Sequence, residues 1–303
     1  MNHIYKFLKE LMPYDFFNSH RLRIGPNGDG GYVLLNDGLE DIDVLYSYGV
    51  NDNSDFELMF CEKFNAIARL YDHTVDAPPL NKECFSFFKE GVGPKKTSSL
   101  NTIENHINHN GDRGKKLVLK MDVEGDEWKT LLHTPISTLN LFYQIIIEVH
   151  FVHSIMPNSI GINLSEARIG EKTNVIRKIN EYFYLYHVHA NNYNPLYYIG
   201  FFKIPNTIEL TFVNKKYFTP KKDSITIFPT EVDYPCDKTR KDIKLHFWPF
   251  YPGTIQHISQ MIAQRGWEKW SEIIKLIFDR VVSKWKSLVI RAKLRRPTSF
   301  SSC

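Results

Sequence analysis

Acidic side chains gather where one apolar segment of the sequence ends. Asp122 and Glu124 follow the run 116–121 at a spacing of two residues. Alternate residues of a strand project to the same side, so both carboxylates can face one ligand. Gly125 then supplies a turn, and Asp126 is a predicted helix N-cap. This pattern is typical of the ligand-binding edge of an open α/β sheet. The alternative is that Asp122 only caps the turn and Glu124 is a solvated loop acid.

A glycine and an acid about 20 residues apart form a second candidate pair. Gly49 follows an apolar strand predicted to begin at residue 43, and Asp72 ends the next one, predicted over 66–74. A glycine after a strand allows close backbone approach, and the later acid has the spacing of a ribose-binding carboxylate. The alternative is that Asp72 is a strand-end residue without a ligand.

The stretch 25–31 is rich in glycine and contains Asp29 and Gly30. It precedes a strand predicted over 31–35. Glycines at this density indicate either a loop that approaches a ligand or the turn of a β-hairpin, and composition alone does not separate the two.

Histidines and asparagines follow two later strands. His150 ends the segment 144–151, which we expect beside the Asp122 strand, so a His–Asp pair is predicted there. An imidazole held by a carboxylate is a competent base near neutral pH. The alternative is a histidine that is hydrogen-bonded in the core. His189 lies in the strand predicted over 185–192, where Asn191 and Asn192 either bind hydroxyl groups or form a turn.

The alternation of strands and helices across 43–183 predicts an α/β fold with a doubly wound, mostly parallel sheet. The last strand, 207–213, is expected to insert antiparallel. Helical spacing over 4–12 predicts an N-terminal helix. The remaining expected elements are helices at 98–109 and 171–183, the first with His106 and His109 on a solvated face, and a Tyr-rich loop at 193–202.

Composition bounds the class of protein. The chain has 303 residues, of which 43% are hydrophobic, and a net charge of +4, which is too small to indicate nucleic-acid binding. The four cysteines are widely separated and form no metal-type pair. With no secretion signal and no membrane-spanning segment in the sequence, we expect a cytoplasmic protein.

We divide the chain into an N-terminal helix (1–20), a main domain (21–250) and a basic amphipathic helical extension (251–303). Residues 265–296 contain ten Lys and Arg against three acids, a net charge of +7. A basic amphipathic helix with tryptophans suits an anionic membrane surface, so 254–296 is a candidate for peripheral membrane contact. The alternative is a helical cap packed on the main domain or on a second subunit.

Several of these motifs together resemble the FkbM-like methyltransferases, and in particular a subgroup with an Asp-Gly-Gly-Tyr motif. The resemblance covers about residues 21–215, and Asn51 departs from it by replacing a second glycine that is common in that class. The residues that carry it are Arg23, Gly25, Asp29–Tyr32, Tyr46, Tyr48–Val50, Phe56–Glu57, Tyr71–Thr74, Leu119–Gly125, Glu127–Trp128, His189 and Asn191–Asn192.

The resemblance implies a Rossmann-like class I fold that binds S-adenosylmethionine. By that resemblance, the glycine turn would hold the methionine end of the cofactor, Asp72 the ribose hydroxyls, and Gly91 and Val92 would border the adenine. Asp122 would lie beside the sulfonium and the acceptor. The full expected cofactor set is Asp29, Gly30, Ser47, Gly49, Asp72, His73, Gly91, Val92 and Asp122.

Methyl transfer to a hydroxyl is an in-line displacement that requires alignment and removal of a proton. The expected catalytic residues are Asp122, His150 and His189. Glu124, Asn191 and Asn192 are expected to contact the acceptor. No metal is expected, although a hard divalent cation on Asp122 and Glu148 is an alternative route to the activated hydroxyl.

The sequence therefore predicts an S-adenosylmethionine-dependent O-methyltransferase. By family analogy, its acceptor would be a sugar hydroxyl of a glycan or glycolipid, which can be lipid-linked. A small metabolite or a protein side chain is the alternative acceptor. The competing class of function is a non-catalytic Rossmann-like binding module in a biosynthetic assembly.

Overall fold

A seven-stranded sheet organises the part of the chain that the computed structural model describes, which is residues 2–152, 162–199, 202–221 and 226–251. The strand order is β10-β13-β9-β8-β3-β4-β5. Strand β13 runs antiparallel to β10 and β9, and the other neighbouring pairs in this sheet are parallel. The strands are β3 (Val44–Tyr48), β4 (Ile67–Tyr71), β5 (Phe85–Phe88), β8 (Leu117–Met121), β9 (Phe142–Val149), β10 (Phe183–Ala190) and β13 (Ile208–Asn214).

This mixed α/β architecture is compatible with a Rossmann-like fold, and it confirms the predicted mostly parallel sheet with an antiparallel last strand. The central strands β3, β8 and β9 are buried along their whole length. Strands that are covered on both faces read as continuous apolar runs, which explains why their positions could be predicted from the sequence.

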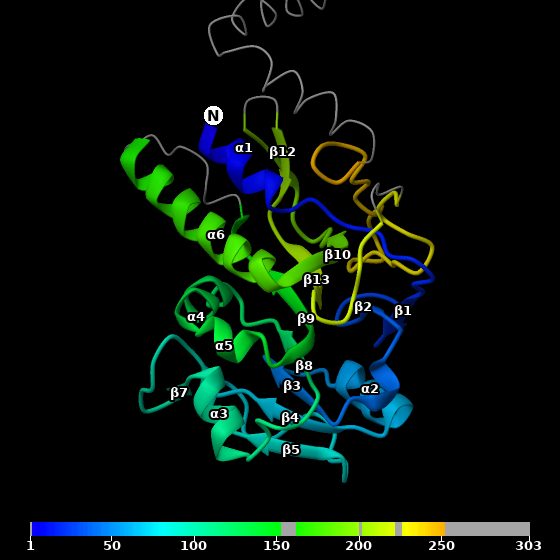
Figure 1. Ribbon diagram of the computed structural model, residues 1–303, viewed down its shortest axis with the longest axis vertical. Helices are drawn as coiled ribbons and strands as arrows, with labels where there is room; N and C mark the ends of the chain where they lie inside the picture. The colour runs from blue at the N-terminus through cyan, green and yellow to red at the C-terminus, as the bar shows by residue number, and fades with distance from the viewer. Residues whose placement is uncertain (1, 153–161, 200–201, 222–225, 252–303) are drawn as a thin grey trace, which may run out of the picture. The chain divides into compact units, whose positions relative to one another are not determined.

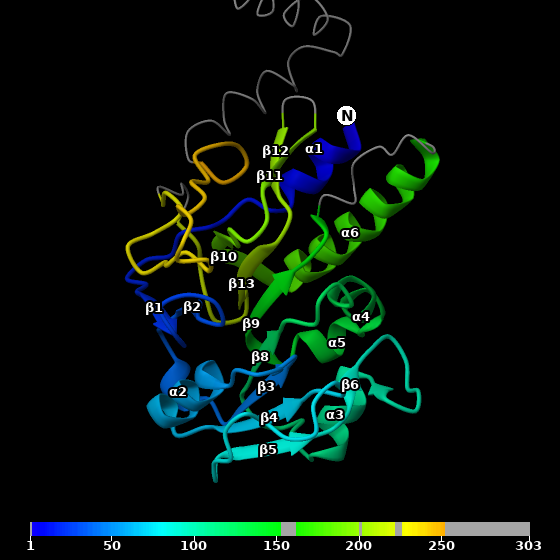
Figure 2. The same ribbon diagram turned by 180° about the vertical axis from the view of Figure 1, so that it is seen from behind.

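Helices cover both faces of the sheet (Figures 1 and 2). On one face lie α3 (Ile103–His109), α4 (Glu127–His133), α5 (Ile136–Leu139) and α6 (Ile162–Tyr182), with α1 (Asn2–Lys9) packed on α6. The opposite face carries α2 (Asp55–Phe64) and a β-hairpin. The N-terminal helix therefore packs within the main unit, residues 1–252; the second unit, 253–303, lies outside the described residues.

The glycine-rich stretch 25–31 is the turn of a hairpin. Strands β1 (Arg21–Ile24) and β2 (Tyr32–Leu35) pair antiparallel around it. The Arg23 guanidinium closes the turn by donating to the carbonyl oxygens of Pro26 at 3.0 Å and Gly28 at 2.7 Å. The turn still borders a cavity, so the hairpin and the ligand-approaching loop are the same segment.

The predicted helix at 98–109 begins later in the structure. Thr102 is its N-cap and accepts a hydrogen bond from the Asn105 N–H, while residues before it form β7 (Leu100–Asn101), which pairs with β6 (Gly91–Val92). The expected solvated face is wrong for His106, which is buried and bonds to the Tyr48 hydroxyl, whereas His109 is exposed as predicted. In the predicted Tyr-rich loop, β11 (Leu196–Ile199) and β12 (Phe202–Pro205) form a second hairpin.

The order of the central strands determines where a ligand can bind. The chain passes from β3 to β4 and β5 on one side, and then crosses back to β8 on the other side of β3, so the strand order reverses at β3. In open α/β sheets, ligands bind outside the carboxyl ends of the strands at such a switch point.

Candidate functional site

A cavity of about 420 Å³ lies at the carboxyl ends of β3, β4 and β8. Asp72 and Asp122 both border it, one from the end of β4 and the other from the end of β8. The predicted site residues that line this cavity are Asp29, Gly30, Gly49, Asp72, His73, Gly91, Val92, Asp122 and Glu124. Its size lies within the usual range of small-molecule sites, about 300–1,000 Å³.

Gly49 forms a turn that no other residue could form here. Its φ is +81°, and a Cβ at this position would lie 1.6 Å from the Asp122 carbonyl oxygen. The backbone of the turn therefore passes directly over the end of β8. The close backbone approach predicted at Gly49 is thus an approach to the end of the neighbouring strand β8. The same turn also borders the cavity.

Asp72 fixes this turn from β4. Its Oδ2 accepts the backbone N–H groups of Val50 at 3.0 Å and Asn51 at 2.9 Å, and its Oδ1 accepts the Thr74 N–H and hydroxyl at 2.8 and 2.6 Å. Burial opposes ionisation, but these hydrogen bonds, led by the Thr74 hydroxyl, hold the pKa of Asp72 below its usual value. The carboxylate is thus ionised and held in position by four donors.

These four bonds use the four lone-pair positions of the Asp72 carboxylate. A ribose hydroxyl could bind it only by sharing an oxygen or by displacing one of the donors. The Thr74 hydroxyl is the one donor that can rotate away without moving the backbone. The structure therefore supports both expectations for Asp72, as a residue that orders the strand end and as a residue that borders the cavity.

A buried polar layer supports the floor of the cavity. Lys120 donates to the Gly49 carbonyl at 2.6 Å and lies 3.8 Å from a Glu57 oxygen. Ser47 donates to Glu57 at 2.5 Å. Ser47 was expected to contact the cofactor, but it does not line the cavity, because it points to the α2 face of the sheet, where Glu57 accepts its hydroxyl.

Asp122 is held on one side only. Its Oδ2 accepts the Tyr32 hydroxyl at 3.0 Å, whereas Oδ1 is buried and has no hydrogen-bond partner among the described residues. A buried carboxylate oxygen without a donor is costly, and a bound ligand can supply the missing hydrogen bond. Asp122 Oδ1 is therefore an unused hydrogen-bond acceptor among the described residues.

Glu127 organises the turn between Asp122 and helix α4. One of its oxygens accepts the N–H groups of Val123 at 3.2 Å and Gly125 at 3.1 Å, and it also contacts His150 Nδ1 at 2.9 Å. The turn needs such support, since Glu124 and Gly125 have φ values of +55° and +112°. Asp126 is the N-cap residue as predicted, but its side chain makes no capping bond.

His150 lies among carboxylates at the end of β9. Because the Glu127 carboxylate accepts, Nδ1 donates, and Nε2 faces Glu124 at 3.4 Å, Glu148 at 3.6 Å and Asp122 at 3.9 Å. Burial lowers the pKa of His150, but the bond to Glu127 and the nearby charges outweigh it and raise the pKa above its ordinary value. Asp122 is the most distant of these carboxylates, so the predicted His–Asp pair is an ion-pair contact at 3.9 Å without a hydrogen bond, and Glu127 is the carboxylate that holds the ring.

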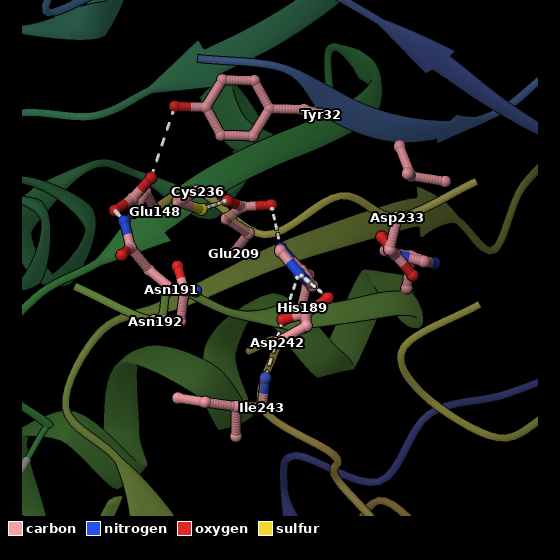
Figure 3. Close-up of polar contacts among 12 residues, drawn as sticks. Tyr32, Glu148, His189, Asn191, Asn192, Glu209, Asp233, Cys236, Asp242 and Ile243 are labelled. Carbon is pink, nitrogen blue, oxygen red and sulfur yellow. Dashed lines mark hydrogen bonds and ion pairs between the residues drawn. The ribbon is translucent and has the colours of Figure 1, made fainter. Parts of the chain in front are cut away.

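Glu148 links the Asp122 region to the next strand pair (Figure 3). It lies 3.5 Å from the Tyr32 hydroxyl and accepts the Asn191 amide at 2.9 Å. Burial, followed by the charges of Asp122 and Glu209, raises the pKa of Glu148 well above its usual value. The Tyr32 hydroxyl thus contacts both carboxylates that were considered as ligands of a hard cation.

The cavity lining does not include four other predicted residues, and one of them is His150, described above. His189 is buried between Glu209 and Asp242, Asn191 bonds to Glu148, and Asn192 holds the 237–241 backbone. His189 and Asn192 were placed near Asp122 because their strand is polar at its end. However, β13 and β9 separate β10 from β8 in the sheet.

Sequence reasoning missed Tyr32, Lys120, Glu57 and Glu127 as site residues. Tyr32 and Asp122 are 90 positions apart, so no local pattern could reveal their contact. For Lys120 and Glu127 a signal exists, because a charged residue inside a buried strand and a buried acid in a first helical turn both need partners.

No helix among the described residues is long and apolar enough to cross a bilayer. A scan of protein-family models finds no match to this chain, and a search of curated proteins finds no match either.

Proposed function

We propose that this protein is an S-adenosylmethionine-dependent O-methyltransferase that acts on a sugar hydroxyl. The observation that carries the proposal is that Asp72 and Asp122 border the same cavity, on either side of the Gly49 turn. The sequence resemblance implies that Asp72 contacts the ribose and that Asp122 lies beside the acceptor. Two acids that opened on different surfaces could not serve one nucleoside-containing cofactor.

The cavity residues fit such a cofactor in chemistry. Asp72 can accept a ribose hydroxyl when the Thr74 hydroxyl rotates away from it, and the Gly49 turn offers a closely approached backbone. Gly91 and Val92 provide a small, partly apolar wall for a base, and a Cβ at Gly91 would lie only 2.4 Å from His73 Nδ1. When bound, S-adenosylmethionine would supply a methyl group already activated by a positive sulfur.

The chain's own part in the reaction is alignment and proton removal. The unsatisfied Asp122 Oδ1 can accept a hydrogen bond from an acceptor hydroxyl and so orient it. His150 Nε2, 3.9 Å from that oxygen, can then take the proton while Glu127 fixes the ring through Nδ1. Because its pKa is raised, His150 is a stronger base, but its imidazole is unprotonated and able to accept a proton only at higher pH.

The experiment is methyl transfer from a labelled donor to glycan and glycolipid pools, with product analysis by mass spectrometry. The parent chain is compared with Asp122→Asn, which keeps the size of the side chain, and with Asp76→Asn at an exposed acid away from the cavity. We expect Asp122→Asn to lower the rate about 100-fold, the size of effect expected when a reacting hydroxyl is no longer correctly oriented. Asp76→Asn should leave the rate unchanged.

The outcomes separate the two classes of function. Full activity in Asp122→Asn contradicts the role proposed for this carboxylate. If the parent chain binds the cofactor but methylates nothing in any pool, the non-catalytic binding module is favoured. If the parent chain does not bind S-adenosylmethionine, the methyltransferase proposal is excluded for every acceptor.

A further inference from the structure

A second polar cluster lies beside the candidate site, where β10, β13 and the segment 226–251 meet (Figure 3). His189 Nδ1 is 3.1 Å from one oxygen of Glu209, and the Cys236 Sγ is 3.2 Å from the other. One ligand atom from each of the three side chains lies within 4.8 Å of the others. The three residues are only 1%, 5% and 4% exposed.

The three donor types select a class of ion. A thiolate sulfur with an imidazole nitrogen and a carboxylate oxygen suits Zn²⁺ and related transition metals, whereas Mg²⁺ and Ca²⁺ prefer oxygen ligands alone. Around a tetrahedral Zn²⁺, neighbouring ligand atoms are roughly 3.4–3.6 Å apart, given the usual bond lengths. The observed 3.1 Å joins Nδ1 to one Glu209 oxygen and the observed 3.2 Å joins Sγ to the other, and each is only a few tenths of an ångström shorter than this spacing.

Asp242 supplies an independent observation. Its two carboxylate oxygens both lie 3.2 Å from His189 Nε2, the ring nitrogen that faces away from Glu209. The Ile243 N–H donates to this carboxylate at 2.8 Å and fixes it. A metal-ligating histidine usually donates its second ring N–H to a carboxylate in this way.

We propose that His189 Nδ1, a Glu209 oxygen and Cys236 Sγ bind one divalent transition-metal ion of the zinc class, and that Asp242 orients the imidazole. The thiolate and carboxylate balance the charge of the ion, and the protons displaced from Sγ and Nδ1 pass to solvent. Three protein ligands leave one tetrahedral position for water or another oxygen ligand. The proposal does not depend on the methyltransferase function.

Such an ion would connect two strands of the sheet to the segment that follows it. His189 and Glu209 lie in adjacent strands and are paired in register, whereas Cys236 and Asp242 belong to a segment without helix or strand. Metal binding therefore predicts a gain in thermal stability, because the folded site binds the ion and the unfolded chain does not hold these atoms together.

The test is a titration of the metal-stripped full chain with Co²⁺, followed by absorbance, and then competition with Zn²⁺. We expect one equivalent to bind, with a thiolate-to-cobalt charge-transfer band that Zn²⁺ abolishes. Zn²⁺ should raise the melting temperature of the chain. A natively folded chain without this band or without bound Zn²⁺ overturns the proposal, since the cluster is then held by hydrogen bonds alone.

Matched variants assign the ligands. Cys236→Ser should remove the charge-transfer band, while Cys84→Ser and Cys303→Ser should keep it. Asp242→Asn should retain the band but weaken Zn²⁺ affinity about 10–100-fold. A band that survives Cys236→Ser places the ion elsewhere and overturns the assignment. If Cys236→Ser does not fold, alkylation of Cys236 in the parent chain is measured by peptide mass spectrometry. Protection by Zn²⁺ supports the site, and unchanged labelling contradicts it.

Discussion

At the scale of single residues, hydrogen-bond saturation decides what each carboxylate can do. Asp72 accepts four internal donors, whereas Asp122 has one buried oxygen without a donor among the described residues. The first residue is fixed before any ligand binds, and the second still has an acceptor to satisfy. Both were predicted from their positions at strand ends, but only the side-chain contacts distinguish them.

Asp72→Asn should destabilise the fold in a pH-dependent way. The folded-state pKa of Asp72 is lowered by its donors, so its stabilising contribution is present above the unfolded value and is lost as the pH falls through the folded value. We expect the variant to lose about 1–3 kcal/mol of unfolding free energy at pH 7 and less in acid. Chemical denaturation at pH 3 and pH 7 measures this. An equal loss at both values contradicts the account, and Asp76→Asn serves as the exposed control.

His150→Gln should show the opposite pH dependence. The pKa of His150 is raised, so its ion pairs stabilise the fold below the unfolded value and are lost as the pH rises through the folded value. The stability difference between parent and variant should therefore be larger at pH 5.5 than at pH 9. His133→Gln, on the last turn of α4, is the matched control. A difference that grows with pH would show that His150 is held neutral.

Part of this arrangement could be predicted from residue types alone. Asp72, Asp122 and His150 stand at strand ends, and parallel strands bring their carboxyl ends to one edge. His189 shows where that reasoning stops, because a strand-end position does not state which strands are neighbours. Tyr32 belongs to the Asp-Gly-Gly-Tyr motif, but nothing in the sequence indicates its contact with Asp122, which lies 90 residues later in the chain.

At the scale of elements, the Gly49 turn joins β3 and α2 and also covers the end of β8. Strand positions were predictable because buried parallel strands are continuous apolar runs. The two-residue strands β6 and β7 were not, since two residues carry no periodicity. Helix starts were predicted less well, because α3 begins later and α6 begins earlier than expected, whereas the position of the α4 start was predicted correctly. Asp126 precedes α4 but makes no capping bond, and Glu127 holds the turn instead.

Gly49→Ala should disrupt this element. The added Cβ would meet the Asp122 carbonyl at 1.6 Å, and the φ of +81° is itself unfavourable for alanine. We expect a loss of about 3 kcal/mol or more in unfolding free energy, at the upper end for overpacking. Gly114→Ala, where a Cβ meets nothing within 4 Å, should change stability by less than about 0.5 kcal/mol. Equal stability of the two variants, measured by thermal unfolding, would contradict the described turn.

At the scale of the whole molecule, positive charge is concentrated in one region. Residues 265–296 carry a net charge of +7, although the chain as a whole carries +4. This region lies outside the described residues, so its predicted membrane contact depends on sequence alone. A basic segment attracts anionic lipid through a screened interaction, and the attraction should fall as salt is added.

The full chain should therefore sediment with vesicles that contain anionic lipid but not with neutral vesicles, and 0.5 M salt should release most of it. Reversal of charge at Lys284, Lys286 and Arg291 should weaken the binding, and the same change at Lys95, Lys96 and Lys115 should not. Equal binding to anionic and neutral vesicles would contradict peripheral contact through 254–296. Equal effects of the two triple variants would contradict it as well.

The most direct measurement of the central claim is calorimetric titration of the chain with S-adenosylmethionine, together with Asp72→Ala and Thr74→Val. The account predicts one binding site per chain with micromolar affinity, and at least tenfold weaker binding in Asp72→Ala. Thr74→Val should bind S-adenosylmethionine as well as the parent chain, because loss of the Thr74 hydroxyl frees one lone pair of Asp72. A folded parent chain that takes up no S-adenosylmethionine would contradict the account, because the cavity between Asp72 and Asp122 would then serve another ligand.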